Sequence, residues 1–145
     1  MKFFYKHKSM QPNINKNFKL FIIEDNRTEN MLLQLALSDI KNLIIKSFPT
    51  ATQMLNHLPE QPDIVLVDLI LPDMSGIDLI KKIRVHNPST RIVVVSAQRD
   101  MDVLAEVQAL GVFNYLVKSE VCLTYLNQVI SELIVLMNYY RNQQA

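Results

Sequence analysis

The chain has 145 residues, of which 49% are hydrophobic and 20% charged, and its formal net charge is +1. This length fits one compact domain with a real core and leaves no room for a second. The single cysteine excludes an internal disulfide framework and a Cys-x-x-Cys zinc site, and no run reaches the roughly 20 apolar residues that a membrane-spanning helix needs. We therefore expect a cytoplasmic protein without a membrane span.

Charge is distributed unevenly along the chain. The first 19 residues hold five lysines and no acid, whereas the other ten basic side chains share residues 20–145 with fourteen acidic ones. A basic arm can contact phosphates or anionic lipids, but most such tails are solvated and flexible. We assign 1–17 to a basic N-terminal arm, 18–141 to one folded domain with an extended last helix, and 142–145 to a tail. We do not expect a nucleic-acid-binding protein.

Short β-branched or aromatic runs alternate with segments whose apolar residues recur every three or four positions. The short runs predict strands at 18–23, 42–48, 63–67, 91–95 and 112–117. The amphipathic segments predict helices at 28–40, 50–58, 77–86, 100–110 and 120–141. Ser75 and Asp100 stand where helix N-caps are expected. Five strand–helix units in this order predict an α/β fold, a three-layer α/β/α sandwich with right-handed crossovers.

Polar side chains follow four of the five predicted strands: Glu24 and Asp25, Asp68, Ser96 and Lys118. In a doubly wound parallel sheet, ligands bind beyond the carboxyl ends of the strands. Taken singly, Asp68 could be a helix cap or a solvated loop residue, and Glu24 and Asp25 could be turn residues. Their convergence with Lys118 at one edge instead favours a functional site.

The charges at this edge indicate its chemistry. Three acids that converge repel one another, and a hard divalent cation such as Mg²⁺ would balance them without His or Cys ligands. An aspartate between a metal ion and an ammonium group is placed to attack phosphorus. We therefore predict that Asp68 is a nucleophile, that Lys118 supplies positive charge, and that Ser96 donates a hydrogen bond to a transferring oxygen.

Four motifs together resemble a known family. They are "IIEDN" (22–26), "PDIVLVDLILPDMSGIDLI" (62–80), "RIVVVSA" (91–97) and "GVFNYLVKS" (111–119). In this order and at these spacings, they resemble the receiver domain of two-component response regulators, in its stand-alone, chemotaxis-regulator-like form. The resemblance implies a flavodoxin-like, doubly wound, five-stranded parallel sheet with strand order 2-1-3-4-5.

The resemblance also implies roles for the residues at the edge of the sheet. Glu24 and Asp25 would hold Mg²⁺ together with the Asp68 carboxylate and the backbone carbonyl of Ile70. Asp68 would accept a phosphoryl group from a histidine kinase or phosphotransfer protein, and Lys118 would pair with that group. The chain would then be a signalling switch rather than an enzyme, apart from its own phosphotransfer and slow autodephosphorylation.

Two further residues are implied in the switch itself. Ser96 would be the switch hydroxyl, and Tyr115 the aromatic side chain whose rotamer reports phosphorylation on the surface formed by the fourth and fifth predicted helices, 100–110 and 120–141, and the fifth predicted strand, 112–117. Tyr115 could also be a plain core residue. The resemblance implies that this surface binds a downstream protein or a second copy of the chain. Because the sequence ends at Ala145, we expect no fused DNA-binding or enzymatic output domain.

Two positions depart from the family's pattern. Ser119 follows Lys118 where members of the family generally have proline in a cis peptide. Because a non-proline cis bond costs about 2.5–4 kcal/mol, we expect a trans bond here that could aim Lys118 differently. Ile70 stands where a polar side chain is common. Its apolar side chain could restrict the attacking water, which predicts a long-lived phosphoryl group.

Three other functions have weaker support in the sequence. An intermediate phosphate carrier in a phosphorelay would use the same residues as a terminal switch. A haloacid dehalogenase-like phosphatase would need a second acid two residues after Asp68, where Ile70 stands. A flavodoxin-like electron carrier would need a Ser/Thr/Gly-rich phosphate loop after the first strand, and "EDNRTEN" offers repelling acids instead.

The last predicted helix, 120–141, carries more apolar residues than packing against one sheet requires. We expect Leu133, Leu136, Met137 and Tyr140 to be exposed and to form a partner or dimer surface. The alternative is that the arm's aromatic residues at 3–5 cover this surface.

Overall fold

The computed structural model describes residues 17–143, so the predicted arm before Asn17 and the last two residues of the predicted tail lie outside the described part. Its sheet contains five parallel strands in the order β2-β1-β3-β4-β5. The strands are β1 (Phe18–Ile23), β2 (Leu43–Phe48), β3 (Ile64–Val67), β4 (Arg91–Ser96) and β5 (Asn114–Val117). The predicted doubly wound topology is confirmed.

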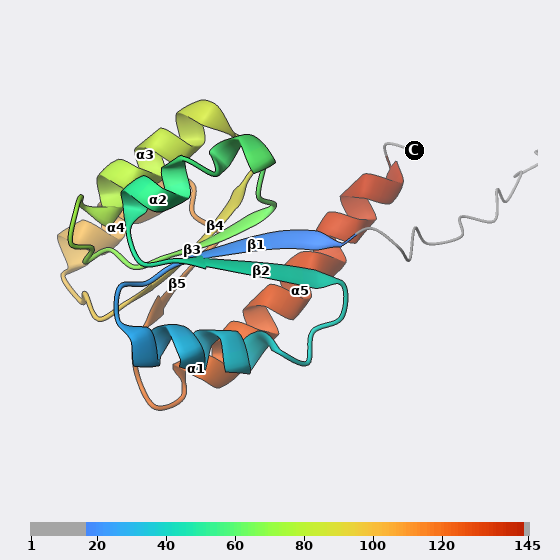
Figure 1. Ribbon diagram of the computed structural model, residues 1–145, viewed down its shortest axis with the longest axis horizontal. Coiled ribbons are helices and arrows are strands. Elements are labelled where there is room, and N and C mark those ends of the chain that lie inside the picture. The colour runs from blue at the N-terminus through green and yellow to red at the C-terminus, as the bar shows by residue number, and fades with distance from the viewer. Residues whose placement is uncertain (1–16, 144–145) are drawn as a thin grey trace, which may run out of the picture.

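Helices cover both faces of the sheet and complete a three-layer sandwich (Figure 1). One face carries α1 (Arg27–Leu37) and α5 (Cys122–Gln143), and the other carries α2 (Ala51–Leu55), α3 (Gly76–His86) and α4 (Met101–Ala109). None of the helices described in residues 17–143 is long and apolar enough to cross a membrane.

Alternation along the strands divides the core in two. In β1, Leu20 and Ile22 pack under α1 and α5, whereas Phe21 and Ile23 pack under α2, α3 and α4. Successive side chains of a strand point to opposite faces, so a strand buried on both faces must be apolar throughout. β3 meets this condition because all four of its residues are buried.

The predicted helix caps are present. The hydroxyl of Ser75 accepts a hydrogen bond from the Asp78 amide at 3.1 Å, at the start of α3. The carboxylate of Asp100 accepts one from the Asp102 amide at 2.8 Å, at the start of α4. Each cap satisfies a backbone donor that has no partner within its helix.

Two helices end three residues before the predicted position, whereas the other predicted helix ends lie within two residues of the observed ones. The helix predicted to reach residue 40 ends at Leu37, where the Ser38 hydroxyl donates to the Leu35 carbonyl at 2.7 Å and closes the last turn. The helix predicted over 50–58 ends at Leu55 and is followed by a short 3₁₀ helix, η1 (Leu58–Glu60). Pro59 lies in η1 and lacks the N–H that a continuing α-helix would need.

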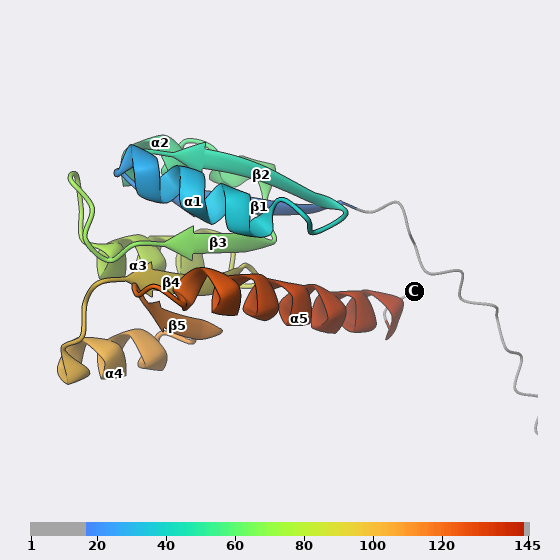
Figure 2. The same cartoon turned by 90° about the horizontal axis from the view of Figure 1, so that it is seen from below.

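The last helix, α5, extends well beyond the neighbouring strand β5 (Figure 2). The prediction that its C-terminal half is exposed is correct for Leu136 and Tyr140. It is wrong for Leu133, which is 1% exposed because it packs into the core between α5 and the sheet. Met137 is partly buried against the same core.

Candidate functional site

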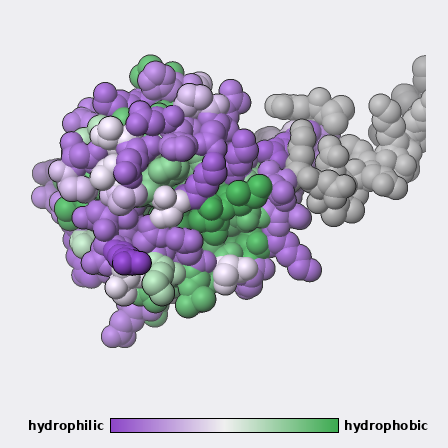
Figure 3. All heavy atoms as spheres, in the orientation of Figure 1, coloured by the Kyte–Doolittle hydropathy of each residue, from purple (hydrophilic) through white to green (hydrophobic). Residues whose placement is uncertain are grey.

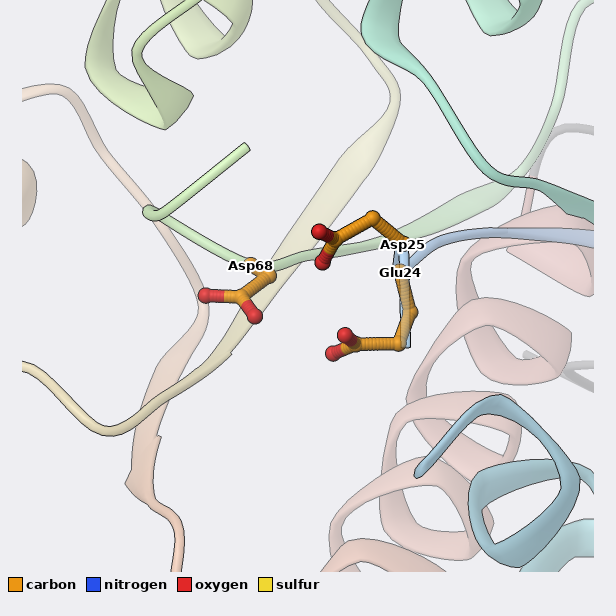
Figure 4. A group of neighbouring side chains, drawn as sticks. All are labelled: Glu24, Asp25 and Asp68. Atoms are coloured by element: carbon orange, nitrogen blue, oxygen red, sulfur yellow. The ribbon is translucent and has the colours of Figure 1, made fainter. Parts of the chain in front are cut away.

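The carboxyl ends of the strands bring the predicted acids together. Glu24 and Asp25 follow β1, Asp68 follows β3, and their carboxylates lie on the same side of the sheet edge (Figure 4). One oxygen from each of the three lies within 4.8 Å of the others. Glu24 and Asp68 are buried, and Asp25 is exposed. Asp25 is therefore the member of the cluster that is exposed to solvent.

Three hydrogen bonds fix the carboxylate of Asp68, which is only 6% exposed. Oδ1 accepts from the Ser96 hydroxyl at 3.1 Å and from the Ile70 amide at 3.0 Å, and Oδ2 accepts from Lys118 Nζ at 2.8 Å. The carboxylate therefore has donors on both oxygens, which fix its orientation at the edge of the sheet.

Close backbone packing holds the loop that follows Asp68. The Gly76 amide donates to the Leu69 carbonyl at 3.0 Å, and a single antiparallel bridge joins Ile70 to Ser75. A Cβ at Gly76 would lie 2.5 Å from Leu69 Cα and 2.7 Å from the Asp68 carbonyl oxygen. Only glycine fits there, so the sequence "MSG" is part of what positions Asp68.

Lys118 reaches across the sheet edge to the acids. Its ammonium group donates to Asp68 at 2.8 Å, to Glu24 at 2.9 Å, and to Glu29 at the start of α1. The Lys118–Ser119 peptide bond is trans, as the absence of proline predicts. With this trans bond, Lys118 still reaches Asp68 and Glu24.

Burial and ion pairing shift the pKa values of two of these groups. Burial raises the pKa of Glu24 to about 7, although hydrogen bonds from Lys118 and the Asn26 amide oppose the shift. Burial by itself would lower the pKa of Lys118, but its bonds to Asp68, Glu29 and Glu24 raise it above its usual value. Lys118 is thus held as a cation beside an acid whose charge is poorly compensated.

The predicted switch residues are linked by a short chain of contacts. The backbone N–H of Gln98 donates to the Ser96 hydroxyl at 3.3 Å, and the Tyr115 hydroxyl donates to the backbone carbonyl of Gln98 at 2.7 Å. The half-buried Tyr115 ring therefore leans on the loop between β4 and α4, and burial raises the pKa of its phenol. A movement of Ser96 can reach Tyr115 through this loop.

Ile70 places only its backbone at the acids. Its amide bonds Asp68, as described above, while its side chain is 60% exposed beside the site.

Three residues near the site were not predicted. Glu29 binds Lys118. The Asn26 side chain caps α1, and the Asn26 backbone N–H donates to Glu24 at 3.1 Å. Gln98 joins Ser96 to Tyr115 through its backbone. The spacing of Asn26 and Glu29 matches a capping box, which puts a glutamate in the first turn of a helix that begins at the site. That signal could have found Glu29. We find no comparable signal for Gln98.

The comparison with family models identifies the chain. The model of the response regulator receiver domain matches residues 20–127, which include all the predicted site residues. DNA-binding transcriptional regulator NtrC from Proteus hauseri is 29% identical over 100 residues, a match that covers 68% of this chain and 21% of that protein. Sporulation initiation phosphotransferase F from Bacillus subtilis is 32% identical over 59 residues, which cover 41% of this chain and 48% of that protein. The chain thus spans less than half the length of these curated relatives.

A solved structure agrees with the sequence comparisons. The isolated REC domain of RcsB from Salmonella enterica serovar Typhimurium, determined with the phosphomimetic BeF₃⁻, superimposes with a TM-score of 0.75 at 25% sequence identity. The superposition covers 81% of this chain and 88% of that domain. The fold, the order of the motifs and the family model all agree. This chain belongs to the response regulator receiver domain family, the phosphorylation-controlled signalling switches of two-component systems.

Proposed function

We propose that Asp68 accepts a phosphoryl group from a histidine kinase or phosphotransfer protein, and that its phosphorylation controls binding to a downstream partner or a second copy of the chain. The observation that carries this proposal is the Asp68 carboxylate itself. It is buried and lies beside two other acids, 2.8 Å from the Lys118 ammonium group.

A magnesium ion fits the residues present. Three carboxylates supply hard oxygen donors within 4.8 Å of one another, and one ammonium group cannot balance them. Burial is the main cause of the raised pKa of Glu24, and the neighbouring charge of Asp68 adds to it, so a cation at this site would favour the ionised carboxylate. Glu24, Asp25, Asp68 and the backbone carbonyl of Ile70 would hold the ion. When bound, it would supply positive charge to the oxygens of the transferring phosphoryl group.

The side chains divide the transfer between them. An oxygen of Asp68 forms a bond to phosphorus as the bond between phosphorus and the donor breaks, and the electron pair of that bond leaves with the donor. Lys118 pairs with a phosphoryl oxygen, and the Ser96 hydroxyl turns from Asp68 to donate to another. Both contacts stabilise charge that grows on these oxygens during transfer.

The contacts of Ser96 give phosphorylation a route to the surface. If Ser96 moves toward the phosphoryl group, its bond from the Gln98 amide must change, and Gln98 also holds the Tyr115 hydroxyl. The ring of Tyr115 would then repack against α4 and β5. This favours an output surface made of α4, β5 and α5, where the partner or the second copy would bind.

The cellular setting is also part of the proposal. The cytoplasm suits the single buried cysteine, Cys122, which forms no disulfide. Slow autodephosphorylation would return the switch to its resting state.

A role as an intermediate carrier in a phosphorelay is the second candidate. The similarity to sporulation initiation phosphotransferase F supports it, because that protein's name describes phosphotransfer. A metal-dependent phosphohydrolase is less favoured, because Ile70 offers no acid two residues after Asp68.

Incubation with Mg²⁺ and a small phosphodonor, followed by measurement of the intact mass, tests the proposal. We expect the mass of one phosphoryl group to be added, to be absent with a chelator, and to be absent in Asp68→Asn. Persistence of the added mass in Asp68→Asn would show that another residue is the acceptor.

A further inference from the structure

Glu29 is fixed beside Lys118 by the start of α1. The Asn26 side chain caps the helix by accepting the Glu29 amide at 3.0 Å, and the Asn26 amide donates to Glu24 at 3.1 Å. The Glu29 carboxylate accepts from Lys118, which also donates to Glu24. These contacts form a closed ring through Glu24, Asn26, Glu29 and Lys118, so the position of Glu29 is not that of a free surface side chain.

The ammonium group of Lys118 is fully committed in this arrangement. A lysine has three N–H donors, and Lys118 directs them at Asp68, Glu24 and Glu29. Glu24 and Asp68 belong to the cluster of acids, whereas Glu29 does not. Glu29 is also more open to water than Lys118, with side-chain exposures of 42% and 20%. Glu29 therefore contacts the cation of the site without belonging to the candidate metal cluster.

We propose that Glu29 is a positioning residue that acts through Lys118: it weakens the binding of the phosphoryl group and strengthens the binding of Mg²⁺. This inference rests on the proposed function of Asp68. The Glu29 carboxylate on Lys118 draws part of the ammonium charge away from a phosphoryl oxygen and repels the anionic group. The same negative charge attracts a divalent cation to the neighbouring acids.

Glu29→Gln separates these effects, because it removes the charge and keeps the size and a hydrogen-bond acceptor. Calorimetric titration measures two dissociation constants, that of Mg²⁺ alone and that of beryllofluoride at saturating Mg²⁺. For a partly exposed pair, we expect beryllofluoride to bind about two- to five-fold more tightly and Mg²⁺ about two- to five-fold more weakly. A purely structural role would not produce opposite shifts, since loosening α1 weakens both.

Glu120→Gln is the matched control. Glu120 is an exposed acid in the turn just after Lys118, and among residues 17–143 it is in none of the ion pairs. We expect it to shift both constants less than Glu29→Gln does. Equal shifts in the two variants would reduce the effect to the general charge of the region and overturn the inference.

The remaining outcomes also decide. If Glu29→Gln leaves both constants unchanged, or weakens both, Glu29 does not act as a counter-charge on Lys118. If the wild-type chain binds Mg²⁺ but not beryllofluoride, the proposed function of Asp68 fails and the inference fails with it. If the wild-type chain binds both Mg²⁺ and beryllofluoride, but the two dissociation constants do not shift in opposite directions in Glu29→Gln, the inference is overturned and the proposed function of Asp68 stands.

Discussion

The two ends of strand β3 each carry an aspartate with a basic partner, and the two arrangements differ in their balance of charge. Before the strand, Asp63 accepts the Lys19 amide and the Arg141 guanidinium, each at 2.8 Å. After the strand, Asp68 accepts Lys118 at 2.8 Å but lies beside Glu24 and Asp25.

The end at Asp63 is a closed structural pair. One carboxylate meets one guanidinium, which also lies 4.0 Å from the centre of the Phe18 ring. The end at Asp68 has three acids and one ammonium group, an excess of negative charge that a folded chain retains at the cost of stability. The comparison teaches that charge balance, rather than the presence of an ion pair, distinguishes the functional site from the structural contact.

The largest expected effect is on the free energy of unfolding, which substitutions at the Asp63 end and the Asp68 end of β3 should change in opposite directions. Asp63→Asn leaves Arg141 with a weakened partner and should lower the free energy of unfolding by about 1–3 kcal/mol. Asp25→Asn removes a repelling charge and should raise the free energy of unfolding of the metal-free protein by a smaller amount. Urea unfolding in the presence of a chelator measures both. A loss of stability in both variants would break the comparison.

The pH dependence of stability tests the cost of keeping the buried acid Glu24 ionised at the Asp68 end of β3. Its pKa is about 7 in the folded protein, mainly because of burial, against a usual value of 4.5. The folded state therefore binds this proton more tightly than the unfolded state. The contribution of protonated Glu24 to the free energy of unfolding is therefore fully present below pH 4.5 and is lost as the pH rises through 7.

Urea unfolding of metal-free protein between pH 4.5 and 7 should thus show falling stability in the wild-type chain relative to Glu24→Gln. Saturating Mg²⁺ should remove this difference, because the ion favours the ionised carboxylate. Parallel profiles for the two proteins without metal would mean that Glu24 is ionised at no cost to the fold.

A smaller effect concerns the lifetime of the phosphoryl group. The backbone amide of Ile70 donates to Asp68, and its side chain is exposed, so we expect this apolar side chain to hinder the approach of water to the phosphoryl group. We expect Ile70→Asn to speed the loss of label a few-fold, measured by intact mass after the phosphodonor is removed. Val121→Asn, at an exposed apolar position just before α5, serves as the control. Decay that is unchanged or slower in Ile70→Asn would exclude side-chain obstruction.

The smallest effect is expected at the far end of α5, on the same side of the molecule as Asp63. Leu136 and Tyr140 are exposed there, and the surface of the protein shows apolar areas among its polar ones (Figure 3). If the output surface reaches this region, Leu136→Glu with Tyr140→Glu should reduce self-association or partner binding in beryllofluoride, as measured by sedimentation and pull-down.

Val85→Glu is the matched control, because Val85 is also exposed and apolar but lies on a different helix, α3. No change in assembly or partner capture in a folded double variant would confine the role of this part of α5 to packing.

The sequence predicted the sheet and the principal residues of the site for physical reasons. Strands buried on both faces appear as continuous apolar runs, and the residue after each run is bound to reach the carboxyl edge. Glu24, Asp68 and Lys118 could therefore be placed together before their distances were known.

Other features depend on geometry that periodicity does not carry. The end of α1 at Leu37 depends on a Ser38 hydroxyl bond, and the burial of Leu133 depends on how α5 lies across the sheet. The pairing of Glu29 with Lys118 depends on the rotational orientation of α1 about its own axis. The apolar pattern defines this orientation only coarsely.

The most direct test of the account is to locate the phosphoryl group. Hydride reduction of the phosphorylated protein converts an acyl phosphate to an alcohol at the modified residue, which peptide mass spectrometry identifies. The account predicts a Mg²⁺-dependent modification at Asp68, retained in Asp63→Asn and absent from Asp68→Asn. Modification at Asp25 or Asp73, or at any residue in Asp68→Asn, would contradict it.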